Sequence, residues 1–413
     1  MSEPLRPPPR KDPQAPTRPP QLPPQERSRA ALGLVGAAAR GVFALQRCGN
    51  CGTVAYPPRD ACAACLSVDL AVEPVPDAGE AIAETTIRTT TDLYFRERAP
   101  WRVGLVRLDC GPSVVTHLHR DVAVPGRVRM VLKLDRSGNA VMMALPTTWS
   151  APMADDPELR ELTASPKFRR VLVTDARTPT GQAVVEALVK AEASLVFAGI
   201  AEPFKPFAGR EKLEATERVQ IVPLDLTDTS SVESLAGEIG GKTDIIVNTA
   251  DHVRPGGLID GPGVATARVS FELNVFGLQR LASSFGPAMR GRGADGTNSA
   301  AAFVDVLPVH ALANWPGFGV HSATAAARLS MLQCLRAELR PGGVRVLSVF
   351  TGPVEDDWRQ SVPPPKVAPR QIASAVVRAL QEGIEESFVG DVAADVAARF
   401  AEDAKTLERE LGS

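Results

Sequence analysis

The sequence predicts a chain of two folded parts: a small β-rich module with a cysteine metal site, then a larger domain in which strands and helices alternate. Three observations carry this prediction. Two CxxC pairs fall within residues 48–65, five short apolar runs follow within 75–147, and a strand, turn and helix pattern begins at Arg169. At 413 residues the chain is long enough for each part to bury its own core.

Composition restricts the kinds of function that we expect. The chain is 44% hydrophobic and 23% charged, with a formal net charge of -2, as in an ordinary soluble globular protein. This balance does not favour a nucleic acid or a membrane surface as the main partner. No apolar run approaches the roughly 20 residues that cross a bilayer, and the N-terminus lacks a secretory signal. We therefore expect a cytoplasmic protein with no membrane span.

Prolines and mixed charges dominate residues 1–27. Such a segment cannot form a helix interior or a sheet ladder, so we predict a disordered proline-rich tail. A proline-rich ligand for a partner domain is the alternative. Residues 28–43 have the apolar spacing of one helix, which leads into the cysteine motif and completes a helix and ribbon unit over 28–74.

The motif QRCGNCGTVAYPPRDACAAC contains four cysteines: Cys48, Cys51, Cys62 and Cys65. Each CxxC pair lets a tight turn present two thiolates to one ion, and two such turns complete a tetrahedral zinc site. In a cytosolic chain this clustering favours a metal over disulfides. Four protein ligands leave no position for water or substrate, so we predict a structural zinc. A redox or iron role is the alternative.

The apolar runs within 75–147 are separated by turns such as CGP, PGR and RSGN. Strands of this number and spacing predict a small closed barrel of the OB type. Few aromatic residues and no basic cluster accompany them, so we do not expect the nucleic-acid binding of many OB-folds. His117 and His119 would share one face of a strand. Metal binding there would need a further ligand, so we expect a plain polar face.

Together these features resemble the rubredoxin-type zinc-ribbon and OB-fold proteins associated with acyl-CoA metabolism. The resemblance covers roughly residues 28–147 and rests on QRCGNCG, PPRDACAAC, GLVRLDCGP and GRVRMVLKL. Members of that family typically serve as partners or fused modules of thiolase-superfamily enzymes and help to form the acyl-CoA channel. The resemblance implies a thiolase-superfamily partner for this chain, with acyl-CoA bound through the partner complex.

Beyond a linker at 148–168, residues 169–413 alternate strands with helices in the manner of a doubly wound, Rossmann-like domain. This region resembles the short-chain dehydrogenase/reductase family. Asp225 in LDLTD, Asn248 in NTAD and Asn274 in NVFG, followed by TGPV, fall in the order and spacing of that family. The complete fold class that we predict is multidomain, with a zinc ribbon and a small β-barrel before the doubly wound domain.

The family's phosphate loop, TGxxxGxG, reads TDARTPTG in this chain. Asp175 replaces the first glycine, Pro179 replaces the second and lacks an N–H donor, and only Gly181 is retained. Ile200 stands where NADP-dependent members often have an arginine, and Asp251 replaces the glycine of NNAG. We therefore expect that Asp175, Pro179 and Gly181, together with Asp225 and Asn248, are vestigial positions, and that NAD(P) is not bound.

The resemblance also identifies the positions of the catalytic residues. Serine, tyrosine and lysine are replaced by Pro308, His321 and Ala325, and only Asn274 of the usual tetrad is present. An imidazole can transfer protons, but no lysine would tune it and no hydroxyl would orient a carbonyl. We therefore expect no catalytic residue in this domain and interpret His321 as a packed side chain.

The function predicted from the sequence is that of an auxiliary subunit of a thiolase-superfamily enzyme that cleaves an acyl-CoA thioester. The dehydrogenase-like domain would act as a scaffold and, as the family resemblance implies, form a homodimer. The alternative is an NAD(P)-dependent reductase of 3-oxoacyl-CoA, or of a related carbonyl, with an atypical active site. The identity of the acyl group, and the choice between thiolytic and retro-aldol cleavage, stay open at this point.

Overall fold

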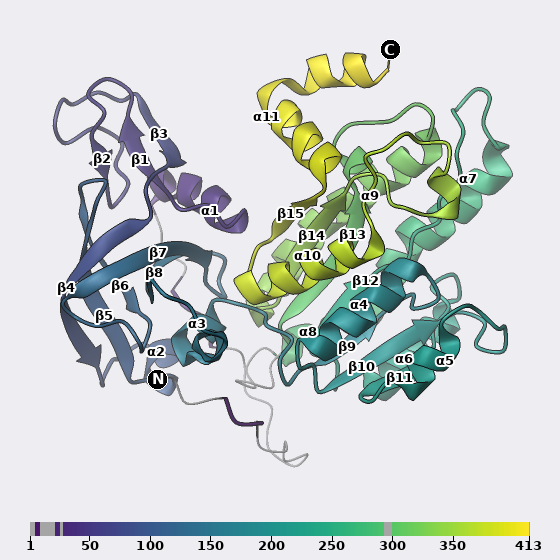
Figure 1. Cartoon of the computed structure of the whole chain (residues 1–413), viewed down its shortest axis with the longest axis horizontal. Coiled ribbons are helices and arrows are strands. Elements are labelled where there is room, and N and C mark those ends of the chain that lie inside the picture. The colour runs from purple at the N-terminus through teal and green to yellow at the C-terminus, as the bar shows by residue number, and fades with distance from the viewer. Residues whose placement is uncertain (1–4, 9–20, 25–27, 293–299, 413) are drawn as a thin grey trace. The chain divides into compact units, whose positions relative to one another are not determined.

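The computed structural model describes residues 5–8, 21–24, 28–292 and 300–412 (Figure 1). It divides into two compact units, one built mainly from residues 21–165 and the other mainly from residues 166–380 and 385–413. Among the described residues no helix combines the length and the apolar character needed to cross a membrane.

The first unit begins with α1 (Leu32–Ala39) and a small antiparallel sheet in the order β2-β1-β3. Its strands are β1 (Ala44–Cys48), β2 (Val54–Ala55) and β3 (Leu70–Pro74). Two loops of this ribbon share one backbone pattern. The N–H of Cys48 donates to Thr53 O, and the N–H of Cys62 donates to Ser67 O in the same way. Each CxxC segment thus forms the tight turn that its spacing predicts.

Five strands then close into a barrel in the order β4-β5-β6-β8-β7. They are β4 (Ala78–Ile87), β5 (Trp101–Leu108), β6 (Ser113–Leu118), β7 (Gly126–Leu134) and β8 (Ala140–Pro146), and α2 (Leu93–Glu97) lies between β4 and β5. Alternate residues of these strands point inward, and Val106, Leu118, Val128 and Met130 are buried in the core. The predicted ribbon and OB-type barrel are confirmed.

The segment expected to be a linker, 148–168, contains a 3-10 helix (Ala151–Asp155) and α3 (Pro157–Glu161). Asp156 begins α3 because its Oδ1 accepts a hydrogen bond from the N–H of Leu159 at 3.0 Å. Leu159 packs against Met143 and Leu145, which belong to β8. Much of this segment is therefore part of the barrel unit rather than a free connection.

This packing corrects the expectation of a plain polar face at the two histidines. His119 is fully buried, and its Nε2 donates to Met153 O at 2.8 Å. His117 Nδ1 lies 3.1 Å from Glu158 Oε2. The carboxylate that the sequence did not place near His117 comes from α3, about 40 residues further along the chain.

Most of the expected disordered tail, 1–27, lies outside the described residues, which include only 5–8 and 21–24 of it. Residues 23 and 24 of the described part are hydrogen-bonded to the barrel unit. Pro23 O and Pro24 O accept hydrogen bonds from the side chains of Ser137 and Asn139.

The second unit is built on a seven-stranded parallel sheet in the order β11-β10-β9-β12-β13-β14-β15. The strands are β9 (Arg170–Val173), β10 (Leu195–Ile200), β11 (Val219–Pro223), β12 (Ile245–Asn248), β13 (Ala302–Pro308), β14 (Arg345–Thr351) and β15 (Glu386–Val389). The order reverses between β9 and β12, and the loops that follow these two strands meet at this switch point. Ligands of doubly wound sheets bind at this edge.

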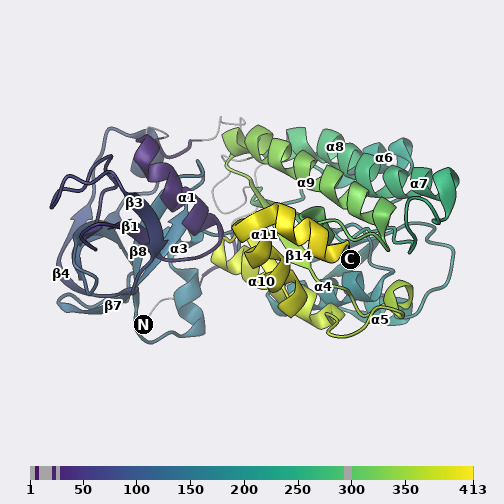
Figure 2. The same ribbon diagram turned by 90° about the horizontal axis from the view of Figure 1, so that it is seen from above.

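Helices cover both faces of the sheet, as the predicted doubly wound class requires. The helices are α4 (Pro179–Lys190), α5 (Arg210–Ala215), α6 (Thr229–Ile239), α7 (Gly263–Phe271), α8 (Gly277–Gly291), α9 (Gly319–Leu339), α10 (Pro369–Glu382) and α11 (Asp391–Leu411). Figure 2 shows α6, α8 and α9 on one side and α4 and α10 on the other. Strands covered on both faces are mainly apolar, as are β9 and β12, each of which has one polar residue at its end.

Candidate functional site

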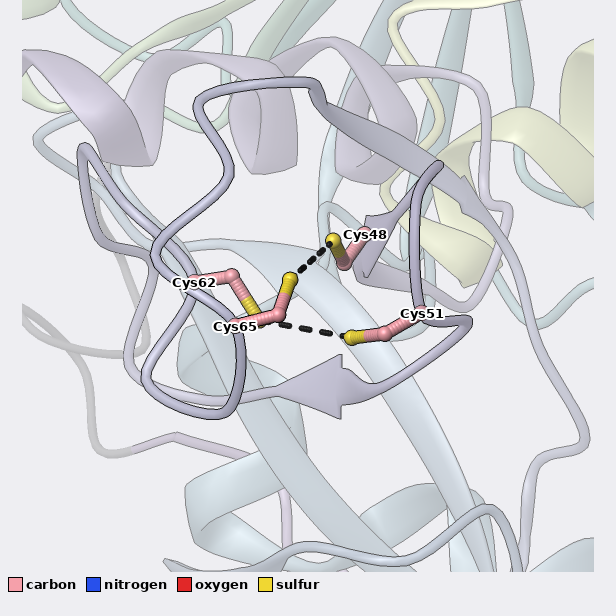
Figure 3. Close-up of side chains that lie close together, drawn as sticks. All are labelled: Cys48, Cys51, Cys62 and Cys65. Carbon is pink, nitrogen blue, oxygen red and sulfur yellow. Dashed lines mark hydrogen bonds between the residues drawn. The ribbon is translucent and has the colours of Figure 1, made fainter.

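The four cysteines of the ribbon converge on one point (Figure 3). Their Sγ atoms all lie within 4.8 Å of one another, and the pairs Cys48–Cys65 and Cys51–Cys62 are each separated by 3.6 Å. Zinc–sulfur bonds of about 2.3 Å in a tetrahedron place neighbouring sulfurs about 3.8 Å apart. The thiols therefore fit a single tetrahedral zinc ion, the metal that their donor chemistry favours.

Neighbouring groups favour the thiolate form of Cys48 and Cys51, whereas the neighbouring thiols raise the pKa of Cys65 to about 11. The hydroxyl of Thr53 lies 3.2 Å from the sulfur of Cys51 and lowers the pKa of that thiol to about 6. The amide of Asn50 donates to Cys65 Sγ at 3.6 Å, and the N–H of Ala64 donates to Cys62 Sγ at 3.4 Å. Such donors stabilise negative sulfur and orient metal ligands.

In the turn between β9 and α4, backbone N–H groups donate hydrogen bonds to side chains of the same turn. Thr178 caps α4, and its Oγ1 accepts from the N–H of Gly181 at 3.0 Å. The N–H of Arg177 donates to Asp175 Oδ1 at 3.0 Å. Pro179, at the first helical position, has no N–H to offer. The N–H groups of Arg177 and Gly181 are thus satisfied within the turn, and Pro179 offers none.

Gly181 is retained for a steric reason. A Cβ at this position would lie 1.8 Å from Asp175 O, so a side chain would collide with the backbone. Burial raises the pKa of the Asp175 carboxyl. The turn keeps the close helix–strand approach of its family, with a carboxylate and a proline at two of the positions where the family has glycine.

The other positions identified from the sequence have structural partners. Asn248 bridges two strands, because its Oδ1 accepts from Thr174 at 2.7 Å and its Nδ2 donates to Asp305 at 2.9 Å. Asp225 Oδ1 accepts from the N–H and the hydroxyl of Thr227. Ile200 is fully buried.

Asn274 lies in a π-helical turn (Glu272–Phe276) between α7 and α8. Its amide donates to His252 O at 3.1 Å and to Thr324 Oγ1 at 3.1 Å, and its Oδ1 accepts from the N–H of His252 at 2.7 Å. It therefore anchors the loop after β12 to α9.

His321 occupies the first turn of α9 and is 2% exposed. Its Nε2 lies 3.0 Å from both carboxylate oxygens of Asp251, which follows β12. Its Nδ1 has no hydrogen-bond partner among the described residues. Pro308, at the end of β13, supplies neither hydroxyl nor N–H, and Ala325 is buried in the apolar core. The structure thus joins His321 to Asp251, a pairing that the sequence did not indicate.

Two arginines complete this cluster. Arg328 is fully buried, lies with its NH1 3.4 Å from Asp251, and forms a closer ion pair with Asp305. Arg359 lies with its NH2 3.5 Å from Asp251. Burial alone would raise the pKa of Asp251, but His321 and the two arginines hold it well below its usual value.

Sequence reasoning missed both arginines and Asp305. The sequence does contain one indication of this cluster: Asp305 lies inside the apolar strand FVDV. A buried carboxylate requires a partner, so a cationic residue was to be expected near it. Here the partner is Arg328, on the face of α9 that carries Ala325 one turn earlier. In this arrangement the ionisable side chains of Asp251, His321 and Arg328 near the switch point are paired with one another.

A four-cysteine ribbon on a five-stranded barrel, joined to a doubly wound sheet of this order, defines a fusion of a zinc-ribbon/OB module with a dehydrogenase-like domain. Comparison with known families agrees. Residues 35–71 match the model described as the rubredoxin-like zinc ribbon domain of ChsH2, and 72–133 match its C-terminal OB-fold domain. Residues 169–366 match the short chain dehydrogenase family. Through its second unit the chain belongs to the short-chain dehydrogenase family, and its residues 35–133 match the ribbon and OB-fold domains of ChsH2.

Individual relatives resemble the second unit. "Short-chain dehydrogenase PC-15" of Penicillium crustosum is 32% identical over 149 residues, which are 35% of this chain and 51% of that protein. The chain thus spans about half the length of that curated relative. A short chain dehydrogenase from Burkholderia cenocepacia J2315, solved in complex with NADP, is 31% identical with a TM-score of 0.54, over 60% of this chain and 98% of that one. One from Streptomyces avermitilis is 26% identical with a TM-score of 0.51, over 59% and 96%.

Proposed function

We propose that this chain is a non-catalytic, auxiliary subunit of a thiolase-superfamily enzyme that cleaves acyl-CoA thioesters by thiolysis or retro-aldol reaction. The ribbon and barrel would provide the contact with the partner, which would supply the nucleophile. The ChsH2-type module supports this proposal, since the resemblance noted from its sequence implies such a partner. Its four ribbon thiols suit a metal, and no other serine or cysteine stands in a nucleophile motif.

The observation that carries the proposal is the Asp251 cluster. Proton transfer to a carbonyl needs a donor that is free to reach the substrate, with a pKa tuned by its neighbours. At the tyrosine position His321 is buried and bound to Asp251, while Ala325 provides no cation and Pro308 no hydroxyl. These residues support a role in folding rather than hydride-transfer chemistry.

Co-purification from the native host tests the partner role. We expect a thiolase-like protein at equal stoichiometry, with cleavage of a CoA thioester that rises when the full-length chain is added to that protein. The comparison is the partner alone, the partner with full-length chain, and the partner with chain truncated before Pro166. Most of the contact should persist in the truncated chain. If full-length chain neither binds nor changes the rate of any thiolase-like protein encoded nearby, the proposal fails.

The second candidate is an NAD(P)-dependent reductase of 3-oxoacyl-CoA or a related carbonyl. It is favoured by the relative solved with NADP, and by a largely apolar pocket of about 740 Å³ lined by Leu258, Trp315 and Ala323 among others. Calorimetric titration with NAD⁺, NADH, NADP⁺ and NADPH separates the candidates. We expect no micromolar binding, because each lost charge-assisted hydrogen bond costs about 1.5–3 kcal/mol. A micromolar dissociation constant for any of the four would favour the reductase.

A further inference from the structure

An aromatic cluster borders a cavity of the barrel unit, with Tyr94 and Trp101 buried and Phe95 half-buried. Tyr94 and Phe95 of α2 pack around Trp101 of β5, with the Phe95 and Trp101 ring centroids 5.1 Å apart. The indole N–H donates to Phe95 O at 2.8 Å, so the polar atom of Trp101 is satisfied within the cluster. The rings line a mainly apolar cavity of about 210 Å³. Such a surface suits an apolar, rigid ligand.

The opposite wall of this cavity is formed by Pro23 and Pro24. The segment is held by two donors on the turn between β7 and β8. Ser137 Oγ donates to Pro23 O at 2.7 Å, and Asn139 Nδ2 donates to Pro24 O at 3.2 Å. Asp135 fixes this turn, since its Oδ1 accepts from the N–H groups of Ser137 and Asn139 at 2.9 Å each.

We propose that this surface is a proline-recognition site whose ligand is a polyproline II peptide, occupied here by the chain's own residues 21–24. Proline has no N–H, so a proline peptide is recognised through its carbonyl oxygens and by aromatic rings against its pyrrolidine faces. The site supplies donors to two successive carbonyls, and three aromatic residues line the same cavity as the two prolines. In the sequence, residues 19–25 read PPQLPPQ, so the motif PPQ occurs twice in this stretch.

The intramolecular ligand is exchangeable because it fills the site incompletely. The cavity of about 210 Å³ remains between the prolines and the aromatic rings. Atoms that line such a space lack contacts on one side, so the bound segment gains less than a closely packed one would. A proline peptide from another protein can therefore compete with residues 21–24. This inference does not depend on the thiolase role.

Calorimetry with the peptide TRPPQLPPQER, residues 17–27, tests the site. The full-length variant Leu22→Gly/Pro23→Ser/Pro24→Gly should bind the peptide, because its own segment no longer competes. Wild-type chain should bind it at least about tenfold more weakly, because a short tether gives an effective concentration near the millimolar range. A peptide with all four prolines replaced by alanine should not bind the variant.

Ser137→Ala in the variant background should weaken peptide binding about fivefold, the effect of one lost hydrogen bond. The matched substitution Ser113→Ala, on an exposed position of β6, should leave binding unchanged. Pro23→Ala/Pro24→Ala is a milder second variant if the first fails to fold, as judged by circular dichroism and metal content. Equal affinity of the peptide for wild type and variant, or equal binding of the alanine peptide, would overturn the proposal.

Discussion

At the scale of single residues, Asp251 determines how the switch point of the second unit is organised. Its carboxylate is shared by His321, Arg328 and Arg359, so one side chain balances three cationic or potentially cationic groups. The sequence shows the replacement of glycine by aspartate, but not its partners. Arg328 lies 77 residues away along the chain and Arg359 lies 108 away, and only the completed fold brings them together.

The substitution Asp251→Ala should destabilise the chain by about 2 kcal/mol, because it removes the carboxylate bound to His321 and one of the two carboxylates paired with each of Arg328 and Arg359. Asp260→Ala, at an exposed site in the same loop, should change stability by less than about 0.5 kcal/mol. Urea unfolding followed by circular dichroism measures both values. Equal midpoints for the two variants would show that the Asp251 cluster contributes little.

His310 makes the stability of the second unit depend on pH. Burial, with repulsion from His321 and Arg359, lowers its pKa to about 3, whereas an exposed histidine titrates near 6.5. Between these values the unfolded state binds a proton that the folded state does not. Stability should therefore be complete above about pH 6.5 and should fall as the pH drops toward 3, by at most roughly 1.4 kcal/mol per pH unit.

The substitution His310→Gln tests this linkage, since glutamine keeps a polar side chain but does not titrate. Melting temperatures of wild type and variant are recorded from pH 8 to pH 4. The difference between the two melting temperatures should become smaller as the pH falls. Asp251 also loses stabilisation in acid, so the difference between the two chains isolates the His310 contribution. Parallel curves would contradict the prediction.

At the scale of elements, the sequence predicts most reliably those helices, strands and turns that depend on the spacing of neighbouring residues. The CxxC turns and the strand and helix alternation after Arg169 are local patterns, and both are confirmed. The helix α3 was missed because it is only one turn long and begins at Asp156-Pro157, in a segment rich in proline and acidic residues. Its burial comes from the barrel surface that it covers. The burial of His119 follows from that same contact and was missed with it.

The ribbon should contain about one zinc per chain. A ribbon of this size has only a small hydrophobic core of its own. Removal of the metal should therefore unfold the ribbon. Plasma mass spectrometry of freshly purified, reduced protein measures the metal. Cys48→Ser should lower the zinc content strongly, whereas Cys110→Ser, outside the cluster, should leave it unchanged. Unchanged zinc in Cys48→Ser would refute the tetrahedral site.

At the scale of the whole molecule, the surface of α7 and the π-helical turn predicts self-association. Val269 and Phe276 are about half exposed and lie seven residues apart, about two helical turns, and Val264 at the start of α7 is 70% exposed. Apolar side chains in this pattern favour burial against a second copy, and a symmetric pair would bury the same patch twice. We therefore expect the chain to form a homodimer through its second unit.

Sedimentation velocity at micromolar concentration should show the dimer. Phe276→Lys should shift the equilibrium toward monomer by at least about tenfold, because it places two like charges in the contact. Phe400→Lys, a substitution of a partly exposed phenylalanine on α11, is the matched control and should remain dimeric. A wild-type monomer at this concentration would contradict the assignment of this surface.

The pairing of Asp251 with His321 and the arginines also makes these positions interdependent if the family's usual residues are introduced. Among the carboxylates that the structure describes, glycine at 251 would leave Arg328 with only Asp305 and Arg359 with only Asp356, and tyrosine at 321 would remove a partner from the Asp251 carboxylate. Each of these changes made alone should lower stability, and the phosphate-loop positions Asp175 and Pro179 would still differ from the family pattern. The effects of the substitutions are therefore non-additive: the cluster tolerates a concerted exchange of its members better than any single one.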